Sequence, residues 1–189
     1  MKKFAVIDTE TTWSDEVMSI GAAIADFEGE TPFELTDKKY YILTPFKDLG
    51  GMYTYALYPN GIKPDFEGTR AQVMKKLREF FSAEKVTAVF AYNALFDQRH
   101  LPELSDYEWY DIMKLAAYRQ YNRKIPRDAD CFSTGRLKRN YGVESMYRML
   151  SGSSSYCEVH NALTDAVDEL ELMKMLALDF NAYSVGRIG

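Results

Sequence analysis

Five residues of the kinds that hydrolytic metal sites use lie in three short stretches of this chain. Asp8 and Glu10 stand two positions apart in "AVIDTETTW", where an apolar run predicts a buried strand. Residues i and i+2 of a strand point to the same face, so we expect the two carboxylates side by side. Asp97 follows the apolar run "VTAVFAYN", and His160 and Asp165 share the stretch "VHNALTDAVDEL". These five residues are the candidates for catalysis.

The spacing of His160 and Asp165 limits how the two can reach one site. Five steps along an ideal helix separate two side chains by about 140°, so they cannot face one site from the same helix. We therefore expect His160 on the loop before a helix and Asp165 in the first turn of that helix. A loop histidine is free to move, which suits a base that acts when substrate is bound.

Four converging carboxylates would repel one another, and burying them is costly without compensating cations. Carboxylate oxygens suit hard cations such as Mg²⁺ or Mn²⁺. Two such ions roughly 3.5 to 4 Å apart clamp a phosphoryl group in known two-metal sites. We therefore predict two divalent ions as cofactors, held by Asp8, Glu10, Asp97 and Asp165.

Each candidate also has a simpler interpretation. Asp8 and Glu10 would then lie at a solvent-facing strand end, and Asp97 or Asp165 would be an acid that a helix N-terminus favours. His160 would be an ordinary loop histidine. One turn beyond the last motif, we expect Asp168 and Glu169 to be solvated charges on the helix surface, and we expect a surface or packing role for His100.

The pattern along the chain predicts strands and helices in a mixed order. Three closely spaced strands at 4–9, 17–27 and 38–45 suit an antiparallel meander, and two more strands are expected at 86–93 and 108–112. Thr69 with Gln72 forms a capping-box signature at the start of a helix. Further helices are expected at 94–101, 113–121, 133–142, 143–152 and 162–178. The order predicts an α/β fold with a mixed five-stranded sheet flanked by helices, in one domain over residues 1–180 with a short tail at 181–189.

Length and composition fit a protein without a membrane role. The chain has 189 residues and a net charge of −5, and none of its apolar runs approaches the roughly 20 residues that span a membrane. Acids follow the first apolar run, where a secretory signal would need a cleavage site. Cys131 and Cys157 match neither a zinc spacing nor a disulfide framework. We expect a cytoplasmic location and no membrane partner.

Positive charge is concentrated in one segment. Residues 114–139 contain eight Lys or Arg against two Asp, a net charge of +6, so the rest of the chain carries −11. Three aromatic residues, Tyr118, Tyr121 and Phe132, are interleaved with these bases. Such a segment is suited to binding nucleic acid, because Lys and Arg side chains pair with phosphates and aromatic rings stack on nucleobases. A solvated helical surface is the alternative interpretation.

Three motifs together resemble a known enzyme family. The stretches "IDTETT", "NALFD" around Asp97 and "HNALTDA" resemble the motifs of the DEDDh exonucleases, the DnaQ-like branch of the ribonuclease H-like superfamily. The stretches "MSIGAAIAD", "NGI" and "WYDIMKLA" also look similar, so the resemblance covers nearly the whole chain. It implies a ribonuclease H-like fold and a 3′→5′ exonuclease that hydrolyses the terminal phosphodiester of DNA or RNA. Single-stranded or frayed ends would be the substrate, and nucleoside 5′-monophosphates would be the products.

The resemblance also implies roles for individual residues. Asp8, Glu10 and Asp165 would hold the ion that activates water, Asp8 and Asp97 would serve the second ion, and His160 would be the general base. The residues that would bind the substrate are Thr11, Thr12, Trp13, Ile20, Asn93 and Phe96. Trp13 stands where the family often has Gly, and Tyr92 stands where a His is common, so substrate preference is the property that transfers least.

Two other functions fit the same motifs. A non-catalytic module that binds nucleic acid or protein would have lost an acid or the base, and none of the five catalytic positions is missing here. A proofreading subunit would work beside a polymerase partner. Several relatives form dimers, so a homodimer is a further possibility that the resemblance raises.

Overall fold

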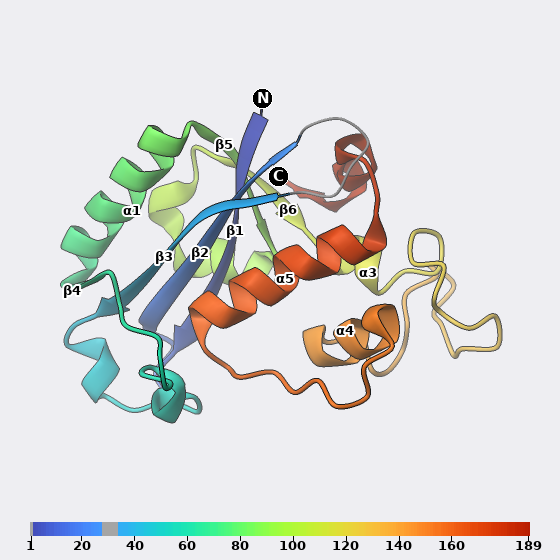
Figure 1. Cartoon of the computed structure of the whole chain (residues 1–189), viewed down its shortest axis with the longest axis horizontal. Helices are drawn as coiled ribbons and strands as arrows, with labels where there is room; N and C mark the ends of the chain where they lie inside the picture. Colours follow the sequence, from blue (N-terminus) through green and yellow to red (C-terminus); the bar gives the residue numbers. More distant parts are fainter. Residues whose placement is uncertain (1, 28–33) are drawn as a thin grey trace.

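Strand β1 (Lys2–Thr11) separates the two larger hydrophobic clusters of the described residues, because its successive side chains point to opposite faces. Phe4 and Val6 belong to one cluster of buried side chains. Ala5 and Ile7 belong to the cluster on the other side. The computed structural model describes residues 2–27 and 34–189 (Figure 1).

The sheet is mixed and has β1 at its centre. Its strand order is β4-β3-β2-β1-β5-β6-β7. Strands β1, β2 and β3 pair antiparallel, as the predicted meander requires. Strands β5 and β6 then continue the sheet in parallel with β1. The remaining strands have the bounds β2 (Val17–Phe27), β3 (Glu34–Leu43), β4 (Phe66–Gly68), β5 (Val86–Ala91), β6 (Glu108–Asp111) and β7 (Arg187–Ile188).

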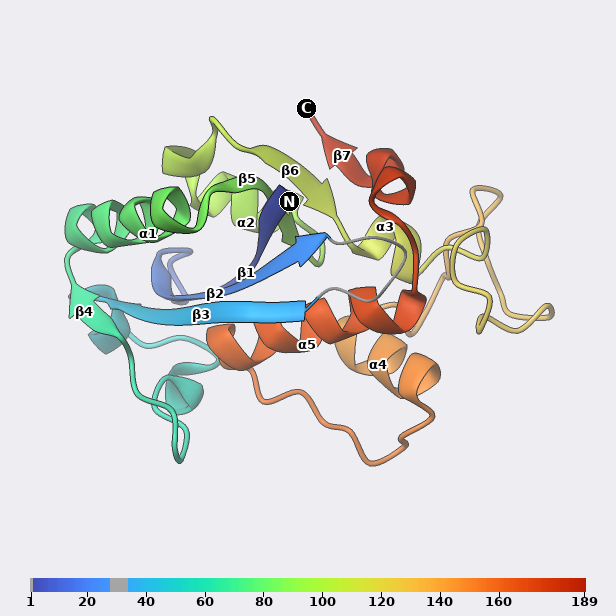
Figure 2. The same cartoon turned by 45° about the horizontal axis from the view of Figure 1, so that its top comes forward.

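Helices cover both faces of this sheet. Helix α1 (Arg70–Glu84) packs on one face, and α5 (Ala162–Leu176) packs on the opposite face with α4 (Val143–Ser151) beside it (Figure 2). Two short helices, α2 (Leu95–His100) and α3 (Met113–Ala116), follow β5 and β6. In residues 2–27 and 34–189, four 3₁₀ helices complete the elements: η1 (Phe46–Asp48), η2 (Thr54–Ala56), η3 (Pro102–Leu104) and η4 (Phe180–Gly186).

The predicted fold class is confirmed, with corrections to its parts. Among the described residues the sheet has seven strands rather than five, because the short edge strands β4 and β7 have too few residues to show an alternating pattern. The expected tail at 181–189 contains β7, which pairs with β6, and the side chain of Tyr183 is buried. The capping box of Thr69 and Gln72 at the start of α1 is confirmed.

The helix predicted from Ser133 to Gly142 is wrong. This stretch forms a small hairpin instead, with isolated bridges that join Tyr118 to Arg136 and Cys131 to Leu137. Gly135 lies at a φ of +88°, a left-handed conformation that interrupts a helix and suits a turn. The helix expected at 113–121 ends at Ala116, because the chain there turns to meet the hairpin. The backbone N–H of Leu137 donates to the carbonyl of Ala117 at 3.0 Å.

Helix α5 lies very close to the sheet at one glycine of β2. A Cβ atom on Gly21 would lie 2.0 Å from the carbonyl oxygen of Ala162, the first residue of α5. Only a residue without a side chain permits this approach, so Gly21 sets the position of the start of α5. In the part of the chain that the structure describes, no helix has the length and apolar character to cross a membrane.

Candidate active site

The carboxyl end of β1 carries the first two acids, between its neighbours β2 and β5. Glu10 is buried, with 7% of its surface exposed. Asp8 is partly buried, and its Oδ2 atom is buried without a hydrogen-bond partner among the described residues. A carboxylate oxygen in that state has lost its hydrogen bonds to water without a replacement, which is costly in free energy unless a cation binds it.

Asp165 and His160 come to the same place from the start of α5. Asn161 is the N-cap of this helix, and its side chain accepts a hydrogen bond from the backbone N–H of Thr164. Asp165 lies in the first turn, and His160 lies on the preceding loop with a φ of +58°. This is the arrangement that the five-residue spacing predicted. Left-handed backbone at a residue other than glycine is unfavourable, and such residues gather at functional sites.

Glu10, His160 and Asp165 form a tight cluster. One potential ligand atom from each of the three residues lies within 4.8 Å of the others. The Oδ1 atom of Asp165 is buried and, like Asp8 Oδ2, has no hydrogen-bond partner in the described ranges.

Asp97 reaches β1 from helix α2. It is 3% exposed, and its Oδ1 accepts a hydrogen bond from the hydroxyl of Thr9 at 2.8 Å. Thr9 lies between the two acids of β1, so this bond joins α2 to the carboxyl end of the central strand. The parallel pairing of β1 with β5 makes this possible, because α2 follows β5 at the same edge of the sheet.

The acids strongly disfavour one another's charge. Burial, followed by the charges of Asp165, Glu158 and Asp97, raises the pKa of Glu10 to about 9. Burial and neighbouring acids raise the pKa of Asp165 to about 8. Burial raises the pKa of Asp97 to about 7 against the opposing hydrogen bond from Thr9.

Two other groups of the cluster shift in ways that fit their surroundings. The pKa of Asp8 is raised well above its usual range by burial and by the surrounding carboxylates, Asp97 first. Burial lowers the pKa of His160, which keeps its ring neutral near pH 7. A neutral imidazole accepts a proton, so the ring is in the form that a general base needs.

A cavity of about 420 Å³ opens over these groups. Of the residues predicted to bind substrate, Thr11, Thr12, Trp13 and Phe96 line it. Trp13 is 72% exposed and Phe96 is 39% exposed, so both present aromatic surface at the cavity.

Two of the predicted substrate residues lie elsewhere. Ile20 is fully buried in the core between the sheet and α1, because residues of β2 alternate between its two faces and this one points into the core. Asn93 lines a neighbouring cavity, and its backbone N–H donates to Asp111 at 3.0 Å. His100 lines that neighbouring cavity too, with its Nε2 3.1 Å from Asp15.

Tyr53 is a site residue that the sequence did not indicate. Its ring stacks on the ring of His160, with centroids 4.0 Å apart and an angle of 15° between the planes. Asn161, next to His160, joins the loop before α5 to the segment that contains Tyr53 and η2. Its side-chain N–H₂ donates to the carbonyl of Ala56 at 2.8 Å and to the hydroxyl of Tyr40 at 3.0 Å, and all three groups are buried. No sequence motif connects positions 53 and 160, so only the fold reveals this contact.

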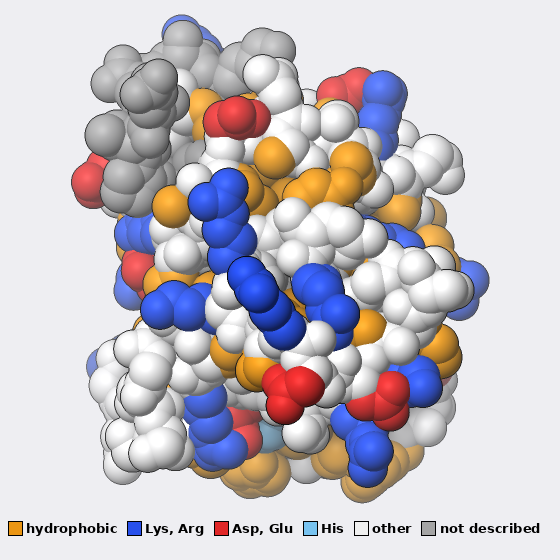
Figure 3. All heavy atoms as spheres, turned by 90° about the vertical axis from the view of Figure 1, so that its right-hand side faces the viewer, with side chains coloured by type: hydrophobic (Ala, Val, Ile, Leu, Met, Phe, Trp, Pro, Cys, Tyr) orange, Lys and Arg blue, Asp and Glu red, His pale blue; other side chains and the backbone are white. Residues whose placement is uncertain are grey.

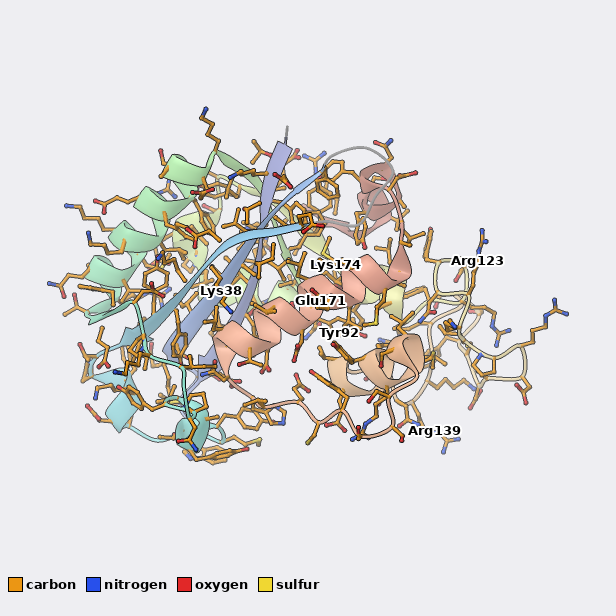
Figure 4. The ribbon with its side chains drawn as sticks, viewed as in Figure 1. Lys38, Tyr92, Arg123, Arg139, Glu171 and Lys174 are labelled. Carbon is orange, nitrogen blue, oxygen red and sulfur yellow. The ribbon has the colours of Figure 1, made fainter. Side chains whose placement is uncertain are left out.

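Three further acids lie near the cluster, and the sequence did not indicate them as part of the site. The expectation that Glu169 is solvated is wrong, because it is 2% exposed and its Oε2 accepts a hydrogen bond from the backbone N–H of Tyr92 at 2.9 Å. Tyr92 lies beside α5, at the end of β5 (Figure 4). Asp168 is partly buried and accepts a hydrogen bond from Tyr156 at 2.6 Å. Glu158, two residues before His160, lines the cavity. The position of Glu169 four residues after Asp165, and thus on the same helix face, is the signal that was available.

The residues present fit a site for divalent cations. The donor set is rich in carboxylates, which are the ligands that Mg²⁺ and Mn²⁺ prefer. Two of its buried oxygens, Asp8 Oδ2 and Asp165 Oδ1, lack partners in the described part of the chain. The raised pKa values have burial as their largest cause and mutual repulsion beside it, and a bound cation offsets both.

The chain is similar in structure to two nucleases. No protein-family model and no curated protein sequence matches it. One similar structure is a 3′-exonuclease that recognises the 3′ end of a histone mRNA stem-loop, with a TM-score of 0.60, 15% identity, and coverage of 90% of this chain and 79% of the other. Another is exonuclease I of E. coli in complex with a dT13 oligonucleotide, with a TM-score of 0.60, 14% identity, and coverage of 96% of this chain. The chain spans 42% of the length of exonuclease I. These likenesses show that the chain shares the mixed α/β fold of these structures.

Proposed function

We propose that this chain is a divalent-metal-dependent 3′→5′ exonuclease of the DEDDh type. It hydrolyses the terminal phosphodiester of single-stranded or frayed nucleic acid and releases nucleoside 5′-monophosphates. The observation that supports this most is the cluster of Glu10, Asp165 and His160 within 4.8 Å at one cavity. The similarity to two nucleases, with the acids at the carboxyl end of β1, agrees with it.

In this proposal Asp8, Glu10, Asp97 and Asp165 hold two divalent ions, Mg²⁺ or Mn²⁺. When bound, such ions polarise the phosphoryl oxygens and lower the pKa of water, which supplies the nucleophile at neutral pH. Thr9 holds Asp97 through its hydroxyl and so fixes this carboxylate relative to the acids of β1.

His160 is the general base of the proposed reaction. Its neutral ring takes one proton from the attacking water as the water oxygen bonds to phosphorus. The bond between phosphorus and the 3′ oxygen of the preceding nucleotide breaks, and the terminal nucleotide leaves with a 5′-phosphate. The stack on Tyr53 holds the ring of His160 beside the acids during this step.

The shape of the cavity favours an unpaired 3′ end. Trp13 and Phe96 are exposed aromatic side chains at the cavity that the terminal nucleotide would enter. Aromatic rings stack on nucleobases of any sequence, and a base inside a duplex offers no free face to them. The proposal therefore assigns stacking on the last nucleotide to these two residues.

The experiment uses matched single-stranded DNA and RNA oligonucleotides labelled at the 5′ end, with Mg²⁺ or Mn²⁺. We expect a ladder that shortens from the 3′ end, and the faster ladder identifies the preferred sugar. EDTA and the variant Asp8→Asn abolish it, and His160→Ala lowers the rate at least about 100-fold, the usual contribution of a general base. His100→Ala is the matched control, because this histidine faces the neighbouring cavity. If folded, metal-loaded protein shortens neither strand, the chain is a binding module rather than an enzyme.

A further inference from the structure

A basic surface lies at the far end of the molecule from α1, on residues 114–139. It contains eight basic and two acidic residues. Lys and Arg side chains gather across this face with hydrophobic side chains between them (Figure 3). Arg123 and Arg139 lie on opposite sides of the loops that form it (Figure 4).

Most of these positive charges have no acidic partner. Of the eight, only Lys138 and Arg139 are within 4 Å of a carboxylate in the described ranges, and both share Asp130. Arg123 and Arg127 are exposed and make no ion pair with any described residue. Charges that only stabilised the fold would be expected to pair with acids, and this chain has 28 acids available. The Lys and Arg side chains without acidic partners therefore create a positive electrostatic potential that attracts an anionic partner.

The surface is built on a fixed backbone rather than on a loose loop. The hairpin is closed by bonds from the N–H of Phe132 to the carbonyl of Arg136 at 2.8 Å and from Lys138 to Asp130 at 3.0 Å. Leu137 and Ile125 anchor the segment in the core, with 6% and 5% of their surfaces exposed. The backbone positions that carry the charged side chains are thus set before any partner binds, which reduces the entropy lost on binding.

An aromatic and guanidinium stack adds a second feature. The guanidinium carbon of Arg136 lies 4.9 Å from the ring centroid of Phe132 and 5.1 Å from that of Tyr141. Both rings remain partly exposed, at 44% and 36%. Exposed aromatic rings beside Lys and Arg side chains without acidic partners are typical of surfaces that bind a nucleic-acid strand. The positive side chains pair with phosphates, and the rings stack on nucleobases.

The basic surface is connected to the candidate active site through Tyr92. The hydroxyl of Tyr92 donates to the carbonyl of Tyr141. Its backbone N–H donates at 2.9 Å to Glu169, which lies one helical turn after Asp165 on α5. Tyr92 therefore links Tyr141, at the edge of the basic surface, to the helix that carries Asp165.

We propose that the basic surface on residues 114–139 binds the phosphate backbone of the substrate strand on the 5′ side of the 3′ end that enters the cavity. This inference rests on the proposed exonuclease function and deepens it, because it specifies long single strands as the preferred substrate. In this proposal, short oligonucleotides fill the cavity without reaching the basic surface. Affinity consequently rises with strand length, and the gain is sensitive to salt because it comes from phosphate contacts.

The test compares the double variant Arg123→Gln/Arg127→Gln with wild type on strands of different length. We expect the KM for a strand of about 20 nucleotides to rise about tenfold or more, and the slope of log affinity against log salt to fall by about two, one for each lost phosphate contact. The kcat, and all kinetics on a strand of about three nucleotides, stay as in wild type. Lys75→Gln/Lys76→Gln on the exposed face of α1 is the matched control, because it removes the same charge from another face.

Two outcomes overturn the proposal. One is an unchanged KM and salt slope on the long strand. The other is an equal loss on short and long strands, which would mean that the arginines act on the cavity itself. Fluorescence anisotropy with the long strand in EDTA measures the same difference without turnover. Binding that depends on Arg123 and Arg127 in protein that cleaves nothing would refute the exonuclease function and leave the basic surface as a nucleic-acid site.

Discussion

The acid cluster predicts a strong link between divalent cations, pH and the stability of the fold. Without cations, carboxylates whose pKa values are raised in the folded protein bind more protons there than in the unfolded chain. Stability is then full below the unfolded pKa values near 4 and falls as pH rises toward the folded values. The folded values reach about 7 for Asp97, about 8 for Asp165 and about 9 for Glu10, so the loss extends from about pH 4 to pH 9.

The size of the effect follows from these pKa values. At pH 7 the carboxyl of Glu10 keeps its proton in the folded protein, where its pKa is about 9, and loses it in the unfolded chain, where the ordinary value is 4.5; this difference lowers the free energy of unfolding by about 3 kcal/mol relative to acidic pH. Cations at a hundredfold excess over Kd restore about 2.7 kcal/mol. A chain of this size gains roughly 2 to 4 °C in Tm per kcal/mol, so we expect an increase of about 5 to 11 °C.

The assay is a series of thermal melts between about pH 5 and pH 9, in EDTA and in saturating Mg²⁺ or Mn²⁺. In EDTA the Tm falls with increasing pH, and the cations remove most of that slope. The variant Glu10→Gln/Asp165→Asn melts at a higher temperature than wild type in EDTA at pH 8 and does not respond to cations. Glu79→Gln, an exposed acid on α1, keeps the full response. A wild-type Tm at pH 8 that is equal in EDTA and in cations would refute the reasoning, as would a full response in the double variant.

Three further predictions concern residues that position the site. Tyr53→Ala removes the stack on His160 and lowers kcat about tenfold with little change in KM, whereas Tyr53→Phe keeps the ring and restores kcat; equal losses in both variants would contradict a positioning role. Gly21→Ala forces the start of α5 away from β2 and lowers both Tm and kcat, and unchanged melting and kinetics would show that the contact is not tight. Glu169→Gln keeps an oxygen that accepts from the N–H of Tyr92, and it raises the free energy of unfolding in EDTA at pH 8. Glu169→Leu leaves that N–H unpaired and lowers the free energy of unfolding by about 1 to 3 kcal/mol, as measured in a urea titration. Identical stabilities of the two Glu169 variants would contradict this assignment.

Local chemistry in the sequence determined much of this protein. The apolar run of β1 and the capping box at Thr69 each depend on a few neighbouring residues, so the sequence states them directly. The placement of His160 on a loop and Asp165 in a first turn also follows from local geometry, because five helical steps cannot bring two side chains to one face.

Tertiary structure decided the features that depend on distant pairing. The helix expected at 133–142 became a hairpin because Ala117 and Leu137 pair across the segment, and no local pattern records that pairing. The short edge strands β4 and β7 exist only through their neighbours. Ile20 matched a family position but is directed into the core by the register of β2.

The same holds for the site itself. The acids are separate in the chain, and the sheet brings them together, because β1 and β5 run parallel and end at the same edge while Gly21 lets α5 approach. The stack of Tyr53 on His160 and the burial of Glu169 follow from that packing. The sequence alone determined which side chains can bind a metal ion or accept a proton. The packing of β1, β5 and α5 determined which of them lie within reach of one another, because proximity across a fold depends on sheet order and register rather than on spacing along the chain.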